Sequence, residues 1–99
     1  MKHLTLDPYV LDTLMPDLVG HDKRPASFVV YLFLLGAASR GRGDVVGASL
    51  QTIAVKTGLS KSTVQAALRH LKRRGLVDAE TIATTAAPVR RVLRPWRRS

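Results

Sequence analysis

The feature that most constrains the fold is the segment SLQTIAVKTGLSKSTVQAALRHL, residues 49–71. It holds a small residue, Ala54, then Gly58 four residues later and Val64 six residues after that. Two helices that cross at a steep angle through a short turn need a small side chain at their contact. The turn also needs a residue that enters the left-handed region at little cost. The spacing therefore predicts two short helices joined by a tight turn at Gly58.

Helix-capping residues mark the bounds of both helices. Ser49 is expected to cap a helix over residues 50–57. Ser60 is expected to cap a second helix over residues 61–74, with Gly75 as a left-handed residue after its end. Apolar residues at helical spacing predict how the second helix packs against the first. The residues of this small predicted core are Leu50, Ile53, Leu59, Val64, Ala67, Leu68 and Leu71.

The same segment holds a partial match to a phosphate-binding loop, GLSKS at residues 58–62. Such a loop needs glycine directly before the lysine and another glycine five residues earlier, so that bare amides can surround a phosphate. Ser60 and Val55 occupy those two positions. The residues before the loop are predicted as helix, whereas the motif needs a strand. We therefore interpret the segment as a turn and a capped helix.

The N-terminal region carries signals for a short helix. Asp7 followed by Pro8 is typical of a helix start, with the acid as N-cap and the proline at the first helical position. The helix is predicted over residues 8–14, with Pro16 and Gly20 ending it. Its apolar stripe consists of Val10, Leu11 and Leu14.

A second predicted helix begins at Pro25 and covers residues 26–40. Apolar residues nearly encircle it, so we expect it to be the central buried helix. Its apolar run of 13 residues, 26–38, is shorter than the roughly 20 residues that a membrane span needs. Gly36, inside this helix, is interpreted as a point where another backbone comes close.

Short strands are predicted on either side of the two-helix segment. After a turn at 41–44, residues 45–46 are expected to form a very short strand. Residues 76–81 are predicted as a strand and 89–94 as a returning strand, with a loop of small residues at 82–88 between them. A basic tail, 95–99, follows and contains Trp96, which we interpret as a packing anchor.

Positive charge is concentrated in one half of the chain. The net charge is +9; residues 1–44 hold five bases and five acids, whereas residues 45–99 hold eleven bases and two acids. A neutral half joined to a strongly basic half is typical of a protein that binds a polyanion. A solubilising surface is the alternative, but solubility alone gives no reason for the bases to gather in one half.

Length and composition indicate a single domain of 99 residues. We divide it into an N-terminal helix and connection (1–24), a central unit (25–94) and the basic tail. The chain has no cysteine, which excludes disulfides and thiolate metal ligands and suits the cytoplasm. Acids within the first 17 residues argue against a secretory signal. We therefore expect a cytoplasmic protein.

The two-helix segment, followed by the hairpin-like stretch RRGLVDAE and PVRRVLR, resembles the winged helix-turn-helix of DNA-binding proteins. Residues 49–77 in particular resemble the DNA-binding domains of GntR-type regulators and the winged helices of plasmid and phage replication initiators. The resemblance covers residues 45–94. It implies a mainly α (α+β) fold, with a three-helix core, an extra N-terminal helix and a C-terminal β-hairpin wing.

The resemblance also implies which residues meet DNA, because the second helix of such a domain enters the major groove with its N-terminal half leading. Lys61 and Arg69 suit guanine edges and Gln65 suits adenine. Hydroxyls and further cations suit phosphates, although serines also serve as caps, last-turn cations also offset the helix dipole and wing arginines also protect an edge strand. The remaining candidates are Ser49, Ser60, Ser62, Thr63, Lys72, Arg73, Arg90, Arg91 and Arg94.

The leading functional hypothesis is a small, nucleoid-associated transcriptional regulator that binds double-stranded DNA as a homodimer. The first helix is the expected dimer contact, through Tyr9, Val10, Leu11 and Leu14, and the alternative is that it simply covers the core. A replication or partition factor and a protein-interaction module are the alternatives. We expect no enzyme, cofactor, metal, membrane or small-molecule effector. The three histidines lack metal-ligand spacing and no Gly-x-Ser-x-Gly elbow is present.

Overall fold

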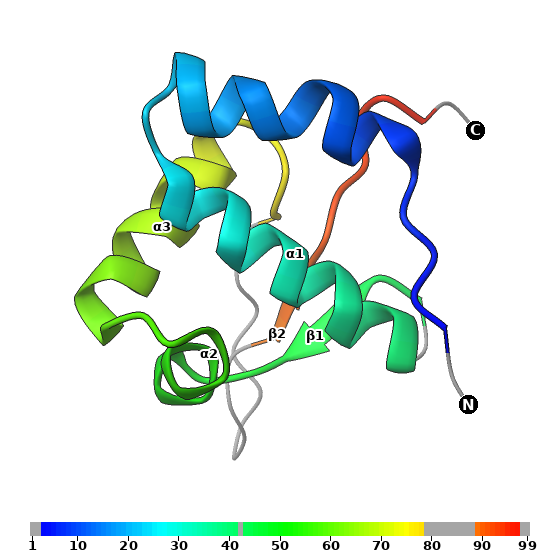
Figure 1. The fold of residues 1–99 in the computed structure, drawn as a ribbon. Helices are drawn as coiled ribbons and strands as arrows, with labels where there is room; N and C mark the ends of the chain where they lie inside the picture. Colours follow the sequence, from blue (N-terminus) through cyan, green and yellow to red (C-terminus); the bar gives the residue numbers. More distant parts are fainter. Residues whose placement is uncertain (1–2, 42, 79–88, 98–99) are drawn as a thin grey trace.

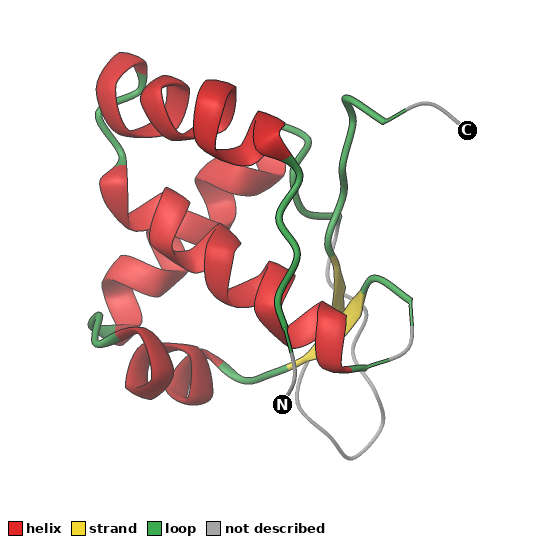
Figure 2. Ribbon diagram, turned by 45° about the vertical axis from the view of Figure 1, so that its right-hand side comes forward, coloured by secondary structure: helices red, strands yellow, loops and turns green. Residues whose placement is uncertain are grey.

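A computed structural model describes residues 3–41, 43–78 and 89–97 of the chain. The fold is mostly helical with a small antiparallel sheet, as the sequence predicts (Figure 2). The elements in chain order are η1 (Val10–Leu14), η2 (Pro16–His21), α1 (Pro25–Arg40), β1 (Val45–Gly47), α2 (Leu50–Thr57), α3 (Lys61–Arg73) and β2 (Val89–Arg91). Among the described residues, no helix has the length and apolar character that a membrane crossing needs.

The N-terminal helix is longer than predicted, because it does not end at Pro16. Its segments η1 and η2 are π-helical, which means that the hydrogen bonds join residues five apart, such as that from the Asp22 N–H to the Asp17 carbonyl (2.9 Å). Pro16 begins η2, a position at which a missing N–H is tolerated. Leu18 of η2 is fully buried, so burial of the apolar stripe continues past the proline and keeps the chain helical.

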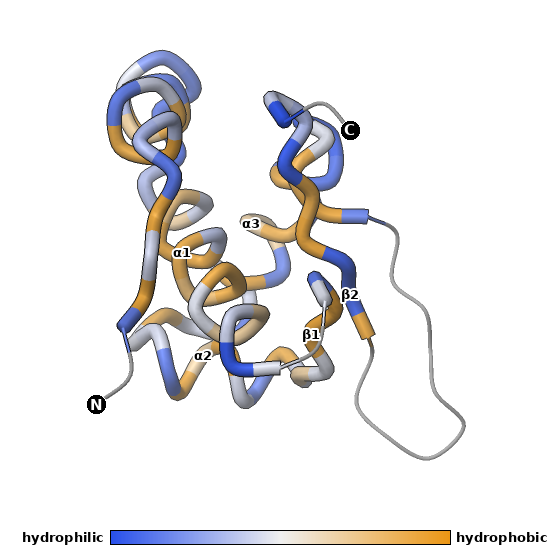
Figure 3. Tube along the Cα trace, turned by 90° about the vertical axis from the view of Figure 1, so that its right-hand side faces the viewer, coloured by the Kyte–Doolittle hydropathy of each residue, from blue (hydrophilic) through white to orange (hydrophobic). Residues whose placement is uncertain are grey.

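Helix α1 is the central helix of the core (Figure 1). It contacts η2, α2, α3 and β1, and apolar residues predominate along it (Figure 3). Its Tyr31 is fully buried and the hydroxyl donates a hydrogen bond to the Leu93 carbonyl (2.8 Å). Burial of this hydroxyl raises the pKa of Tyr31. The prediction for Gly36 is wrong, since a Cβ added there would meet no atom within 4 Å.

The two-helix segment has the predicted geometry. The Ser49 Oγ accepts a hydrogen bond from the Thr52 N–H, and the Ser60 Oγ accepts one from the Thr63 N–H (both 3.1 Å). Gly58 is left-handed at φ 81° and joins α2 to α3. The predicted core residues are buried or partly buried: Leu50, Ile53, Leu59, Val64, Ala67, Leu68 and Leu71.

The sheet brings together the chain before and the chain after the two-helix segment. β1 pairs antiparallel with β2, with Val46 opposite Arg90. On the other side of the same segment Val77 forms a bridge with Val92, and the Asp78 N–H bonds to the Arg91 carbonyl (2.9 Å). The predicted hairpin is therefore confirmed near its base. The predicted loop 82–88 and residues 79–81 lie outside the described residues.

The returning strand is shorter than predicted and ends at Arg91. The chain then leaves the sheet and runs beside the start of η1 (Figure 1). Trp96 stacks on Tyr9, with ring centroids 4.6 Å apart, and its Nε1 donates to Asp7 Oδ2 (2.9 Å). The prediction that Trp96 anchors the tail is confirmed. This contact joins two segments from opposite ends of the chain.

Candidate nucleic-acid interface

Helix α3 presents one polar side to solvent. Each residue of an α-helix is rotated by about 100° from the one before it. Ser62, Gln65, Arg69 and Arg73 therefore fall on one side, and all four are exposed. The opposite side carries the apolar stripe and packs on the core. Lys61 is exposed at the first position of the helix, so the side predicted to meet DNA is free to do so.

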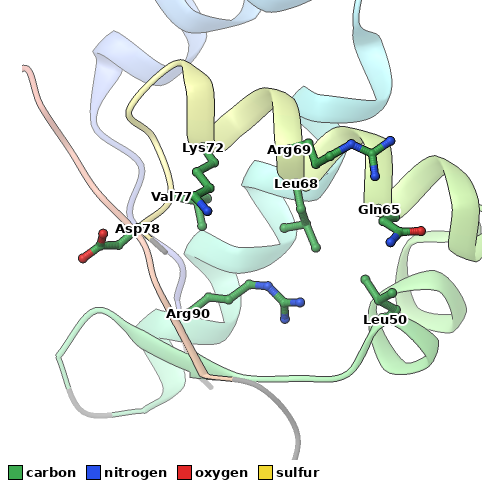
Figure 4. Close-up of a pocket in the computed structure, with 8 residues that line it drawn as sticks. All are labelled: Leu50, Gln65, Leu68, Arg69, Lys72, Val77, Asp78 and Arg90. Carbon is green, nitrogen blue, oxygen red and sulfur yellow. The ribbon is translucent and has the colours of Figure 1, made fainter. Parts of the chain in front are cut away.

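A hollow of about 420 Å³ lies beside this polar side, between α3, the start of α2 and the sheet (Figure 4). Arg90 extends into it from β2, and Lys72 extends into it from α3. Gln65 and Arg69 lie along its outer edge. The lining carries three cations and one carboxylate, that of Asp78, so its net charge is positive and suits a phosphate backbone.

The two adjacent arginines of β2 have different surroundings. Successive side chains of a strand point to opposite faces. The Arg90 side chain points inward, is only 5% exposed and donates a hydrogen bond from Nη1 to the Ala48 carbonyl (2.7 Å). Arg91 is exposed. Arg90 thus ties β2 to the segment that leads into α2, a role that the grouping of both residues in the sequence did not distinguish.

Several other arginines are bound to carboxylates that come from distant parts of the chain. Arg94 pairs with Asp44, and Arg97 pairs with Asp7 at 3.3 Å. Arg74 binds Asp17 and, through Nε at 3.0 Å, Asp22. Within the part of the chain that the structure describes, the cations without an ion pair are Lys23, Arg24, Arg40, Lys56, Lys61, Arg69, Lys72, Arg73 and Arg91. Most of them lie on or beside α2 and α3.

A buried polar network positions α3, and sequence reasoning missed it. His70 Nδ1 is 2.8 Å from Ser27 Oγ of α1, and its Nε2 is 2.8 Å from Asp22 Oδ2. Hydrogen bonds from His21 and His70, with the charge of Arg74, lower the pKa of Asp22. The signal for it in the sequence is a polar residue on the apolar side of each of two helices, Ser27 in α1 and His70 in α3.

The order Ser27, His70, Asp22 matches that of a hydrolase triad, but the geometry does not support catalysis. The Ser27 residue is 1% exposed, so a substrate has no access to its hydroxyl. The histidine instead satisfies two polar groups in the packed contact between α1 and α3. We assign this network to positioning.

A cluster with metal-ligand atoms also lies in this region. Asp17, His21 and Asp22 each bring one such atom within 4.8 Å of the others. The Arg74 guanidinium already binds both carboxylates, and so supplies the positive charge that the cluster attracts. We therefore assign the cluster to the ion pairs that hold η2 against the end of α3.

The hydroxyl candidates are engaged in local hydrogen bonds. Ser49 and Ser60 cap α2 and α3, which is the alternative role considered from the sequence. Ser60 Oγ donates a hydrogen bond to Thr63 Oγ1 (2.8 Å). Ser60 Oγ also lies 3.2 Å from Ser62 Oγ. Ser62 is exposed and Thr63 is half-buried, so Ser62 is the more accessible hydroxyl at the start of α3.

The fold and this surface define a winged helix-turn-helix protein. The sequence model of the MarR family matches residues 31–86, which are 56 of the 99 residues. The chain therefore belongs to the MarR family, a family of DNA-binding transcription regulators. The resemblance to GntR-type regulators and replication initiators is not confirmed by this match. No curated protein and no solved structure matches the chain.

Proposed function

We propose that this protein regulates transcription by placing α3 in the major groove of an operator. The observation that carries the proposal is the set of exposed cations without ion pairs on the solvent-facing side of α3. Membership of a family of DNA-binding regulators supports it. The cytoplasm, at the nucleoid, is where such a protein would act.

Side-chain chemistry divides the proposed contacts into two groups. Lys61, Gln65 and Arg69 are assigned to base edges, since they lie in the N-terminal two thirds of α3 and are exposed. Phosphates are assigned to Ser62, Lys72, Arg73 and Arg91. We leave out of the contact set the two arginines held by other groups, Arg90 and Arg94, and the capping serines Ser49 and Ser60.

A second copy of the chain is proposed to dock on the N-terminal helix. The expected contacts Val10 and Leu14 are buried in the core, so that part of the sequence-based prediction is wrong. A parallel stripe on the outer side of η1 and η2 is exposed: Leu11, Met15 and Val19, at 44%, 40% and 38%. One module contacts few base pairs, and a dimer on a palindrome would supply the missing specificity.

Sedimentation of paired variants tests the dimer. Met15→Lys with Val19→Lys should convert a dimer into a monomer, because four lysines would meet across a symmetric contact. Val55→Lys is the matched control, since Val55 is an exposed apolar residue (66%) on α2. A wild-type protein that sediments as a monomer on and off DNA would exclude the dimer.

Selection of bound sequences from a random duplex pool tests DNA reading. Arg69→Ala should weaken binding by about 1–3 kcal/mol and relax the preference at one base position. Arg94→Ala is the control, since Arg94 is paired with Asp44 away from the proposed contacts. The proposed orientation of α3 is wrong if Arg69→Ala leaves the selected sequences unchanged.

A further inference from the structure

A second hollow, of about 310 Å³, lies on the side of α3 away from the sheet. Its walls come from the connection before α1, with Lys23 and Arg24, and from the first turns of α3, with Ser62 and Thr63. The sheet-side hollow is lined by Gln65, Leu68, Arg69 and Lys72 of α3. The second hollow is lined by the α3 residues Ser62, Thr63, Ala66 and Ala67. The two hollows therefore flank the polar side of α3.

Lys23 and Arg24 are exposed, and neither has an ion-pair partner within the described residues. Their neighbour Asp22 does not neutralise them, because its carboxylate faces His21, His70 and Arg74. The connection therefore adds two net positive charges beside the start of α3. Both residues come from the half of the sequence whose charges sum to zero.

The dimensions of the major groove indicate what Lys23 and Arg24 would face if α3 lay in it. The groove is about 12 Å wide, and an α-helix with its side chains is about 10–12 Å across. A helix that fills the groove has a phosphate strand on each side. Groups that flank the polar side of α3 therefore face these two strands. The sheet side offers Lys72, and the opposite side offers Lys23 and Arg24.

The connection is held in place before any DNA arrives. The Arg24 N–H donates to the Leu18 carbonyl (2.8 Å), and the Ser27 N–H donates to the Arg24 carbonyl (3.0 Å). Asp22 and Ser27, on either side of the two cations, both bind His70 of α3. A pre-positioned backbone loses little conformational freedom on binding, so the contacts cost little in ordering.

We infer that Lys23 and Arg24 form a second phosphate-contact surface, which binds the DNA strand opposite the one met by the sheet. The inference rests on the proposed insertion of α3 in the major groove. It gives the protein a clamp of cations around α3 in place of a single wing contact. The surface reads no bases, because its cations face the backbone.

The salt dependence of DNA binding tests this surface. Each phosphate contact contributes about 0.9 to the slope of log K against log salt concentration. Lys23→Gln with Arg24→Gln should therefore reduce the slope by about 2, with the base preference of the wild type retained. Arg40→Gln is the matched control, since Arg40 is an exposed, unpaired arginine at the other end of α1. It should leave the slope near the wild-type value.

Ethylation interference gives a positional readout with the same variants. The wild type should show interfering phosphates on both strands that flank the α3 contact, and the double variant should lose those on one strand only. A double variant with the wild-type slope, or with the change seen for Arg40→Gln, would overturn the inference and leave the Arg69 test untouched. If the wild type itself shows no salt-dependent binding, the proposed function fails first, and this surface fails with it.

Discussion

Two groups of cations have different surroundings. One group lies around α3, and the other consists of arginines near the sheet and the chain ends. Lys61, Arg69 and Arg73 are exposed and have no ion pair within the described residues. Arg94 and Arg97 are bound to the carboxylates of Asp44 and Asp7. Aspartates from the first half of the sequence thus neutralise arginines from the second half.

This difference changes the meaning of the charge pattern. The sequence places all the net charge in residues 45–99. In the folded protein, ion pairs neutralise part of that charge. Lys23 and Arg24 of the neutral half lie beside α3 and have no ion pair within the described residues. The positive surface therefore consists of cations that tertiary structure leaves unpaired. Position in the chain does not define it.

The largest expected effect concerns the buried network of Ser27, His70 and Asp22, which holds α3 against α1. His70→Leu should lower the free energy of unfolding by about 2–4 kcal/mol, because the buried Ser27 hydroxyl loses its hydrogen bond to His70 and the Asp22 carboxylate loses one of its three partners. Chemical denaturation would measure it. Ser27→Ala added to His70→Leu should restore part of the loss. A loss below 0.5 kcal/mol, roughly the scatter of surface substitutions, would mean that the network does not hold α3 in place.

The next effect separates the two arginines of β2. Arg90→Ala should destabilise the fold by about 1.5–3 kcal/mol, because a charged group donates to the buried Ala48 carbonyl. Arg91→Ala should change stability by less than about 0.5 kcal/mol and weaken DNA binding at low salt. Thermal unfolding and binding titrations compare them. Equal stability of both variants would contradict the inward role of Arg90.

A smaller effect separates Arg73 from Arg74 at the end of α3. Arg74→Gln should cost no more than about 1 kcal/mol of stability, since its ion pairs are partly exposed, and should leave the salt slope of DNA binding unchanged. Arg73→Gln should reduce that slope by about 0.9 and leave stability unchanged. If both variants reduce the slope alike, the distinction between paired and unpaired cations has no bearing on DNA binding.

The smallest effect is the acid response of the contact between the chain ends. The hydrogen bond from Trp96, then those from the Tyr9 N–H and Arg97, lower the pKa of Asp7 below 3.8. A carboxylate with a lowered pKa stabilises the fold above its unfolded value, and that contribution disappears as pH falls through the folded pKa. Stability should therefore hold from pH 7 to about 5 and decrease at lower pH.

Trp96 fluorescence reports this contact directly. In Asp7→Asn the change in fluorescence on acidification should be smaller than in the wild type, because the titrating group is gone. Asp12→Asn is the control, as Asp12 is exposed on η1 away from Trp96. An unchanged acid response in Asp7→Asn would exclude Asp7 as the group that titrates.

Local signals predicted the helix-turn-helix well. Ser49, Gly58 and Ser60 act on neighbouring backbone groups, so their roles as caps and turn depend on few residues. The start of α1 at Pro25 follows from the same local chemistry. The end of the N-terminal helix was predicted wrongly, because burial of Leu18 against the core outweighs the helix-ending tendency of Pro16.

The candidate interface was predicted only in part. The polar side of α3 follows from helical periodicity, so Gln65 and Arg69 were placed correctly on the solvent-facing side. The separation of Arg90 from Arg91 depends on strand alternation and on a carbonyl that lies 42 residues away in sequence. The positions of Lys23 and Arg24 beside α3 depend on the packing of α1 against α3, which no local pattern encodes.

The sequence by itself determined the helices, their caps and the stripe that turns the polar side of α3 outward, because these follow from contacts within about one helical turn. Only the tertiary structure decided which cations remain available for DNA. A carboxylate neutralises an arginine at a few ångströms of separation, and those separations arise when residues such as Asp17 and Arg74 are brought together from opposite halves of the chain.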